Sequence, residues 1–217
     1  MRGLSASQQR ETCFHEAGHA VIFALGGINV FGVAVAPAGA QAWRTPSSSG
    51  RVCSDLWGLC RKSELILPRQ LLRWLMSEGA LHPDGRGHEA ILRTPEGQIL
   101  LAALNAQQQR EIRAQMVGLL AGPAAEQMHR GDDVCLQSGD ELEDFARAAA
   151  LATLIPAGAD LSRLLAFTTK TLQKPEIWQL VTALAGELER TGEVAQRIKA
   201  FLPTALPDWP PACASQG

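Results

Sequence analysis

The chain has 217 residues, of which 46% are hydrophobic, so it is long and apolar enough to bury one substantial core. Charged residues make up only 19% and the formal net charge is -2, which gives no strong field to attract nucleic acid or an acidic membrane surface. Aromatic residues make up 5%, with no tyrosine, and this disfavours a surface on which bases stack. We therefore expect no nucleic-acid partner.

The cysteines and the N-terminus bear on the cell compartment. Five cysteines, an odd number without any Cys-x-x-Cys spacing, indicate reduced thiols rather than a disulfide framework. Residues 1–10 lack the apolar segment of a secretory signal. Residues 20–43 are uncharged and long enough to span a bilayer, but glycines and Pro37 interrupt them, so we expect a helix end, a turn and a buried strand there. The sequence therefore predicts a cytoplasmic protein with no membrane-embedded part.

The first part of the chain predicts one helix and two strands. Ser5 and Gln8 have the spacing of a capping box, which predicts a helix from about Ala6 to the glycine pair at 26–27. The β-rich run 30–35 predicts a strand. A loop rich in Gly, Pro and Ser follows, and a second short strand is expected around 50–53.

The middle of the chain has the weakest pattern. Residues 68–77 are expected to be helical, while 88–93 and 98–103 flank the turn-like Thr94-Pro95-Glu96-Gly97 and predict a hairpin. From Asn105, which can cap a helix, an amphipathic run leads to His129 and is expected to bend or break at Gly122-Pro123.

The rest of the chain is expected to be helical up to residue 201. One helix is expected to begin around 138–140 and to continue past Ala152. Three more are expected over 160–172, 175–190 and 193–201. The fold class is therefore mainly α with a small β-sheet (α+β). We expect one domain over residues 1–201, with an insert at about 55–104, and a mobile tail rich in Pro and Ala over 202–217.

The first predicted helix carries a metal-binding pattern, His15-Glu16-Ala17-Gly18-His19. His15 and His19 are one helical turn apart, so both imidazoles lie on one face and can reach one cation. Zinc accepts such ligands and in catalytic sites leaves one position for a water. Glu16 lies beside that face, where it can act as general base for the water. The alternative is a helix with two incidental histidines.

A catalytic zinc site of this kind needs a third protein ligand. Asp140, Glu141 and Asp144 share one helical face, and periodicity does not choose among them. Asp140 can be explained as an acid in the first helical turn, where it interacts favourably with the positive end of the helix dipole. Glu141 can be explained as the second residue of a capping box with Ser138. Asp144 lies inside the expected helix, where a carboxylate has neither of these structural roles. The remaining histidines are interpreted as surface or structural residues: His82, His88 and His129.

Three segments resemble FtsH-type ATP-dependent zinc peptidases. Residues 15–21, His-Glu-Ala-Gly-His-Ala-Val, are similar to the zinc-binding helix of that family. Residues 117–126, Val-Gly-Leu-Leu-Ala-Gly-Pro-Ala-Ala-Glu, resemble its Leu-x-Gly-Gly-Arg-Ala-Ala-Glu segment. A later family helix supplies an Asp ligand in Asn-Asp-Leu-x-x-Ala-x-x-Leu-Ala. Residues 143–152, Glu-Asp-Phe-Ala-Arg-Ala-Ala-Ala-Leu-Ala, match that register with Asp144 in the ligand position.

The resemblance implies a zincin-like helix packed in a helical peptidase domain, with zinc held by His15, His19 and Asp144 and with Glu16 as base. Glu126 is then a candidate acceptor that orients a ligand histidine, or else a helix-surface acid. The sequence departs from the family in having no ATPase module, no phosphate-binding loop and no membrane anchor. It therefore predicts a stand-alone, ATP-independent relative.

These observations together predict a zinc-dependent endopeptidase that acts on peptides or unfolded protein. The strand at 30–35 is expected either to align the substrate by strand addition or to be an ordinary buried strand. The alternative function is a non-catalytic, zinc-stabilised helical binding or adaptor protein. A third possibility is a helical interaction module that binds no metal.

Overall fold

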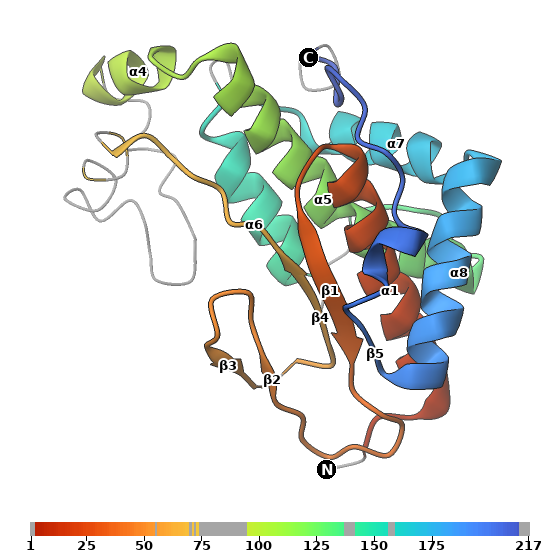
Figure 1. Cartoon of the computed structure of the whole chain (residues 1–217). Helices are drawn as coiled ribbons and strands as arrows, with labels where there is room; N and C mark the ends of the chain where they lie inside the picture. Colours follow the sequence, from red (N-terminus) through yellow and green to blue (C-terminus); the bar gives the residue numbers. More distant parts are fainter. Residues whose placement is uncertain are drawn as a thin grey trace.

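The computed structural model describes residues 3–54, 56–69, 71, 73, 95–136, 142–155 and 159–212. It is mainly helical with a small antiparallel sheet, which confirms the expected α+β class (Figure 1). Among the described residues, no helix is both long enough and apolar enough to cross a membrane.

Two long helices form the centre of the molecule, and each starts as its sequence predicts. Helix α1 (Ala6–Leu25) begins after Ser5, whose hydroxyl accepts the backbone N–H of Gln8 in a complete capping box. Helix α5 (Ala106–Arg130) begins in the same way after Asn105. It continues through Pro123 as one helix, so the expected break at that proline is wrong.

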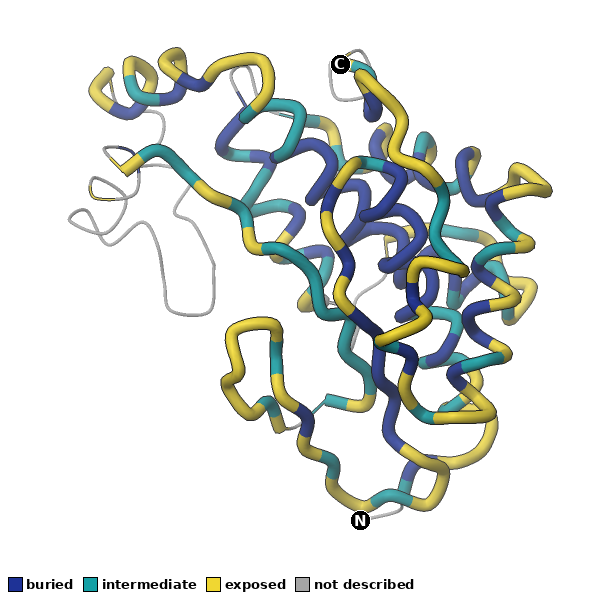
Figure 2. The backbone as a smooth tube through the Cα atoms, viewed as in Figure 1, coloured by how far each residue is buried: buried dark blue, intermediate teal, exposed yellow. Residues whose placement is uncertain are grey.

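Small residues let α1 and α5 lie unusually close together. A Cβ added to Gly18 of α1 would lie 2.5 Å from the carbonyl oxygen of Ala121 in α5, and one added to Gly118 of α5 would lie 2.1 Å from the ring of Phe23. The two helices are dark blue over most of their length in Figure 2 because their facing sides are buried. This contact is the main part of the core, and it places α5 directly against the His-Glu motif.

The main sheet has the strand order β4-β1-β5, with all neighbours antiparallel. Strand β1 (Val30–Val35) has the predicted bounds. It pairs with β4 (Gly58–Lys62) on one side and with β5 (Glu193–Val194) on the other. Of the two interpretations of this strand, an ordinary buried strand is favoured over one that aligns a substrate, because β4 pairs along its length and β5 pairs with Val33 and Ala34. The edge strand beside the site is β4, which the sequence did not predict.

A second, two-stranded sheet lies in the loop after β1 and pairs β2 (Thr45–Pro46) with β3 (Val52–Cys53). Strand β3 confirms the short strand expected around 50–53, whereas β2 was expected to be loop.

Helices α6 (Leu142–Ala152), α7 (Leu161–Leu172) and α8 (Pro175–Thr191) cover the two central ones (Figure 1). Helix α7 and helix α6 pack against α5, while α8 packs against α1. The starts of α7 and α8 agree with the sequence, since Asp160 caps the first and Pro175 opens the second.

Two expected elements are wrong. Residues 95–102 form helix α4 (Pro95–Ala102) rather than the turn and second strand of a hairpin, because Pro95 is a favourable first helical residue. The other half of that hairpin, 88–93, lies outside the described residues. The expected helix 193–201 is instead β5 followed by a short 3-10 helix, Ile198–Phe201, because Gly192 ends α8 with a φ of 74°.

Residues 68, 69, 71 and 73 of the helix expected over 68–77 are described, and all but residue 68 are helical. Part of the expected tail packs on the domain: Trp209 is buried, and the N–H of Leu206 donates to the carbonyl of Leu25. The domain boundary at 201 stays a prediction.

Candidate metal centre

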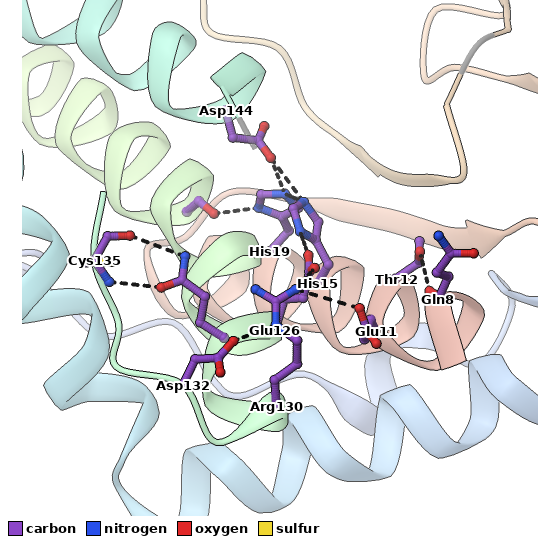
Figure 3. Close-up of polar contacts among 12 residues, drawn as sticks. Gln8, Glu11, Thr12, His15, His19, Glu126, Arg130, Asp132, Cys135 and Asp144 are labelled. Atoms are coloured by element: carbon purple, nitrogen blue, oxygen red, sulfur yellow. Dashed lines mark hydrogen bonds and ion pairs between the residues drawn. The ribbon is translucent and has the colours of Figure 1, made fainter. Parts of the chain in front are cut away.

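Three predicted site residues meet at one point. The Nε2 atoms of His15 and His19 lie 3.0 Å apart, and they lie 3.1 Å and 3.0 Å from Oδ2 of Asp144 (Figure 3). The histidines come from successive turns of α1, and Asp144 comes from the first turn of α6. We call these three residues the His-His-Asp cluster.

Hydrogen bonds on the far side of each ring fix which nitrogens face the cluster. Nδ1 of His19 lies 2.8 Å from the carbonyl oxygen of Gly118, which can only accept, so Nδ1 carries the proton. Nδ1 of His15 donates in the same way to Glu126 at 2.9 Å. In neutral rings, both Nε2 atoms then present lone pairs to each other and to the Asp144 carboxylate. Three acceptors that converge on one point are held together either by a proton on one of the rings or by a metal cation among them.

The donor set and its dimensions fit zinc. A tetrahedral zinc with bonds of 2.0–2.1 Å needs ligand atoms about 3.3 Å apart, close to the separations in the cluster. Two histidines and one carboxylate also match the three protein ligands of catalytic zinc sites. Gly122 of α5 makes the space, since a Cβ there would lie 2.3 Å from Nε2 of His19 and 2.8 Å from Nε2 of His15.

Glu126 holds His15 in place and is itself held by a charged residue. One of its carboxylate oxygens accepts from His15, and the other accepts from the Arg130 guanidinium at 2.6 Å. Arg130 also donates to Asp132 at 2.8 Å and lies 3.6 Å from Glu11 of α1 (Figure 3). Of the two interpretations of Glu126, its place in the structure favours the acceptor that orients a ligand histidine.

Glu16 lies beside the cluster without joining it. Its side chain is only 7% exposed, and its carboxylate accepts the backbone N–H of Cys60 in β4. Gly58 makes room for it, because a Cβ at that position would lie 2.5 Å from Oε1 of Glu16. The edge strand β4 therefore fixes the carboxylate between the sheet and the cluster.

Burial and mutual charge shift the acid–base properties of these groups. Burial raises the pKa of Glu16 above its usual range, which makes it a stronger base when ionised. Burial opposes charge on Asp144 and on His15 as well. At Asp144 the attraction of His19 and His15 outweighs burial, and at His15 the hydrogen bonds to Asp144 and Glu126 outweigh it. The pKa of Asp144 is held well below its usual range, and that of His15 rises to about 10.

A cavity of about 780 Å³ opens onto the cluster, within the size range of ligand sites. Glu16, Lys62 and Arg147 contribute charged groups to it. Much of the remaining lining is apolar and comes from α1 and the residues just before it, from β4 and the loop before it, and from α5: Leu4, Phe23, Leu56, Trp57, Leu59 and Leu119.

Of the other candidates from the sequence, His129 is described and does not join the cluster. His129 stacks on Phe14, with ring centroids 3.8 Å apart. Asp140, Glu141, His82 and His88 lie outside the described residues. Three features of the site were not predicted from the sequence: the Gly118 carbonyl, Gly122 and Lys62. Each reaches the site through long-range packing, and none has a local signal for its role there.

No protein-family model matches the chain, and no curated protein sequence matches it either. The likeness to FtsH-type peptidases thus depends on the segments quoted above, and membership of that family stays a prediction.

Proposed function

We propose that the protein is a zinc-dependent metallopeptidase that cleaves peptides or unfolded protein without ATP. The observation that carries the proposal is the convergence of His15, His19 and Asp144, with Glu16 next to them in the same cavity. The tautomers fixed by Glu126 and by the carbonyl of Gly118 leave three acceptors facing one point. A structural site would need no buried carboxylate such as Glu16 beside it, whereas a hydrolytic site needs one.

When bound, zinc would supply a Lewis acid and lower the pKa of a water to about 7. Glu16 is placed to accept the proton of a water that would attack the peptide carbonyl in this cavity. The raised pKa of Glu16 suits this role, because a stronger base removes the proton more readily. Glu16 then gives the proton to the leaving amine and returns to its ionised form. The N–H of Cys60 keeps the carboxylate oriented throughout.

Replacing Glu16 with glutamine tests the proposal directly. Glu16→Gln keeps the shape of the side chain but removes the base, so we expect bound zinc at the wild-type level and hydrolysis of casein or mixed peptides reduced by about 10²–10⁴-fold. Glu143→Gln is the matched control, because Glu143 borders the same cavity but its side chain is 72% exposed and paired with Arg147.

Wild-type turnover in Glu16→Gln would contradict the role of Glu16. Zinc bound by the wild type without any hydrolysis would favour the non-catalytic, zinc-stabilised binding protein instead.

A further inference from the structure

Lys62 is a cation in the cavity that the mechanism above does not use. It is the last residue of β4, and its side chain lines the same cavity as Glu16 and His19. Its Nζ lies 4.8 Å from the centre of the Phe23 ring, and that ring is stacked on His19 with centroids 5.9 Å apart. The ammonium group of Lys62 therefore lies beside Phe23, which in turn contacts His19 of the cluster.

Neutral groups hold this ammonium. Nζ donates to Oε1 of Gln115 at 2.6 Å, and Gln115 is only 2% exposed, so the acceptor is fixed in the core. Among the residues that the structure describes, no carboxylate forms an ion pair with Lys62. Burial lowers the pKa of Lys62. Cys60, Glu64 and Asp144 act against that shift, and the positive charge of Arg147 adds to it. A partly buried cation held by an amide and an aromatic face is positioned to attract negative charge that appears in the cavity.

We propose that Lys62 is a further catalytic residue, which donates a hydrogen bond to the substrate carbonyl oxygen as negative charge develops on it. This inference rests on the peptidase function proposed above. Preorganised donors of this kind stabilise a transition state without having to reorganise during the reaction.

The water oxygen forms a bond to the carbonyl carbon, the π pair of the carbonyl moves onto its oxygen, and Glu16 takes the water proton. Lys62 stabilises that oxygen through a hydrogen bond and keeps its own proton. When the pair returns, the carbon–nitrogen bond breaks and the amine leaves with the proton from Glu16.

Lys62→Met is the first test, with Lys170→Met as the control, because Lys170 is an exposed lysine of α7 that does not line the cavity. With an amide-capped peptide, we expect kcat to fall about 100-fold in Lys62→Met, with KM and zinc content at wild-type values. Lys170→Met should retain the wild-type kcat. Lys62→Gln is the second variant, used if Lys62→Met does not fold. It keeps a hydrogen-bond donor for Gln115 but removes the charge, and its kcat should fall by the same factor.

Ligand binding gives a second readout that does not depend on turnover. A peptide phosphonate carries a tetrahedral anion like the reacting centre, whereas a peptide hydroxamate does not carry that tetrahedral charge. Calorimetry on the zinc-loaded protein should show the phosphonate bound about 100-fold more weakly by Lys62→Met, with the hydroxamate unchanged.

Three results would overturn the inference: an unchanged kcat and phosphonate affinity, equal weakening of both ligands, or a rise in KM confined to peptides with a free terminal carboxylate. The last would make Lys62 an anchor for the substrate terminus. A wild-type chain that binds zinc but cleaves nothing would refute the proposed function instead, and phosphonate binding would still decide whether Lys62 recognises the charge.

Discussion

At the scale of single residues, His15 uses both ring nitrogens. Nδ1 donates to Glu126, and this bond leaves Nε2 free to face Asp144 and His19. Partners on the far side of a ligand histidine fix its orientation and raise its basicity. Glu126 thus affects the site without facing the point where the three acceptors meet.

Removing that partner should weaken the metal site without destroying it. We expect Glu126→Leu to raise the dissociation constant for zinc about 10–100-fold, since His15 loses the acceptor that fixes its tautomer. Competition with a zinc-binding dye measures this constant. Glu143→Leu is the control and should bind zinc as the wild type does, because Glu143 contacts Arg147 and neither histidine. Equal affinities in the two variants would contradict the role given to Glu126.

The residues of the site differ in how far the sequence could predict them. His15, Glu16 and His19 follow from their spacing on one helix, which is local information. Periodicity allowed two other acids besides Asp144. Asp144 was preferred because the other two have structural explanations, and the resemblance to a family favoured the same carboxylate. Lys62 had no signal at all, since strand β4 reaches the site only through its pairing with β1.

At the scale of elements, the site depends on how closely α1 and α5 approach. The added Cβ of an alanine at position 18 would clash with backbone and side-chain atoms of Ala121 and Ala125 in α5. The same substitution at Gly186 in α8 meets no atom within 4 Å. The two glycines therefore provide a matched pair in which only the contact between helices differs.

We expect opposite signs of the stability change for these two substitutions. Gly18→Ala should lower the free energy of unfolding by about 1–3 kcal/mol, because the helices must separate. Gly186→Ala should raise it by about 0.5–1 kcal/mol, because alanine restricts the unfolded chain and favours the helix. Urea denaturation measures both. Stabilisation by Gly18→Ala would show that the two helices are not in contact at this position.

Elements with local signals could be predicted, and those that depend on distant pairing could not. Capping by Ser5, Asn105 and Asp160 and the proline at 175 gave the starts of four helices. Strand β5 and the 3-10 helix after it were expected to be one helix, because their sequence has no strand signal and only pairing with β1 makes β5 a strand.

At the scale of the whole molecule, the His-His-Asp cluster joins parts of the chain that are far apart in sequence. His19 and Asp144 are separated by 125 positions, and α5 lies between them in the chain and supplies Glu126 and the carbonyl of Gly118. A bound metal would therefore hold α1 and α6 together across α5. Zinc binding should depend on the whole fold rather than on the His-Glu helix alone.

Zinc content per chain is the measurement that tests the account most directly. We predict one zinc in the wild type, the loss of that zinc in Asp144→Ala, and full retention in the double variant Asp140→Ala/Glu141→Ala, which removes the two acids that periodicity left open. Circular dichroism on the same samples checks that each variant is folded. A folded wild type without zinc, or a folded Asp144→Ala that keeps its zinc with wild-type affinity, would contradict the account.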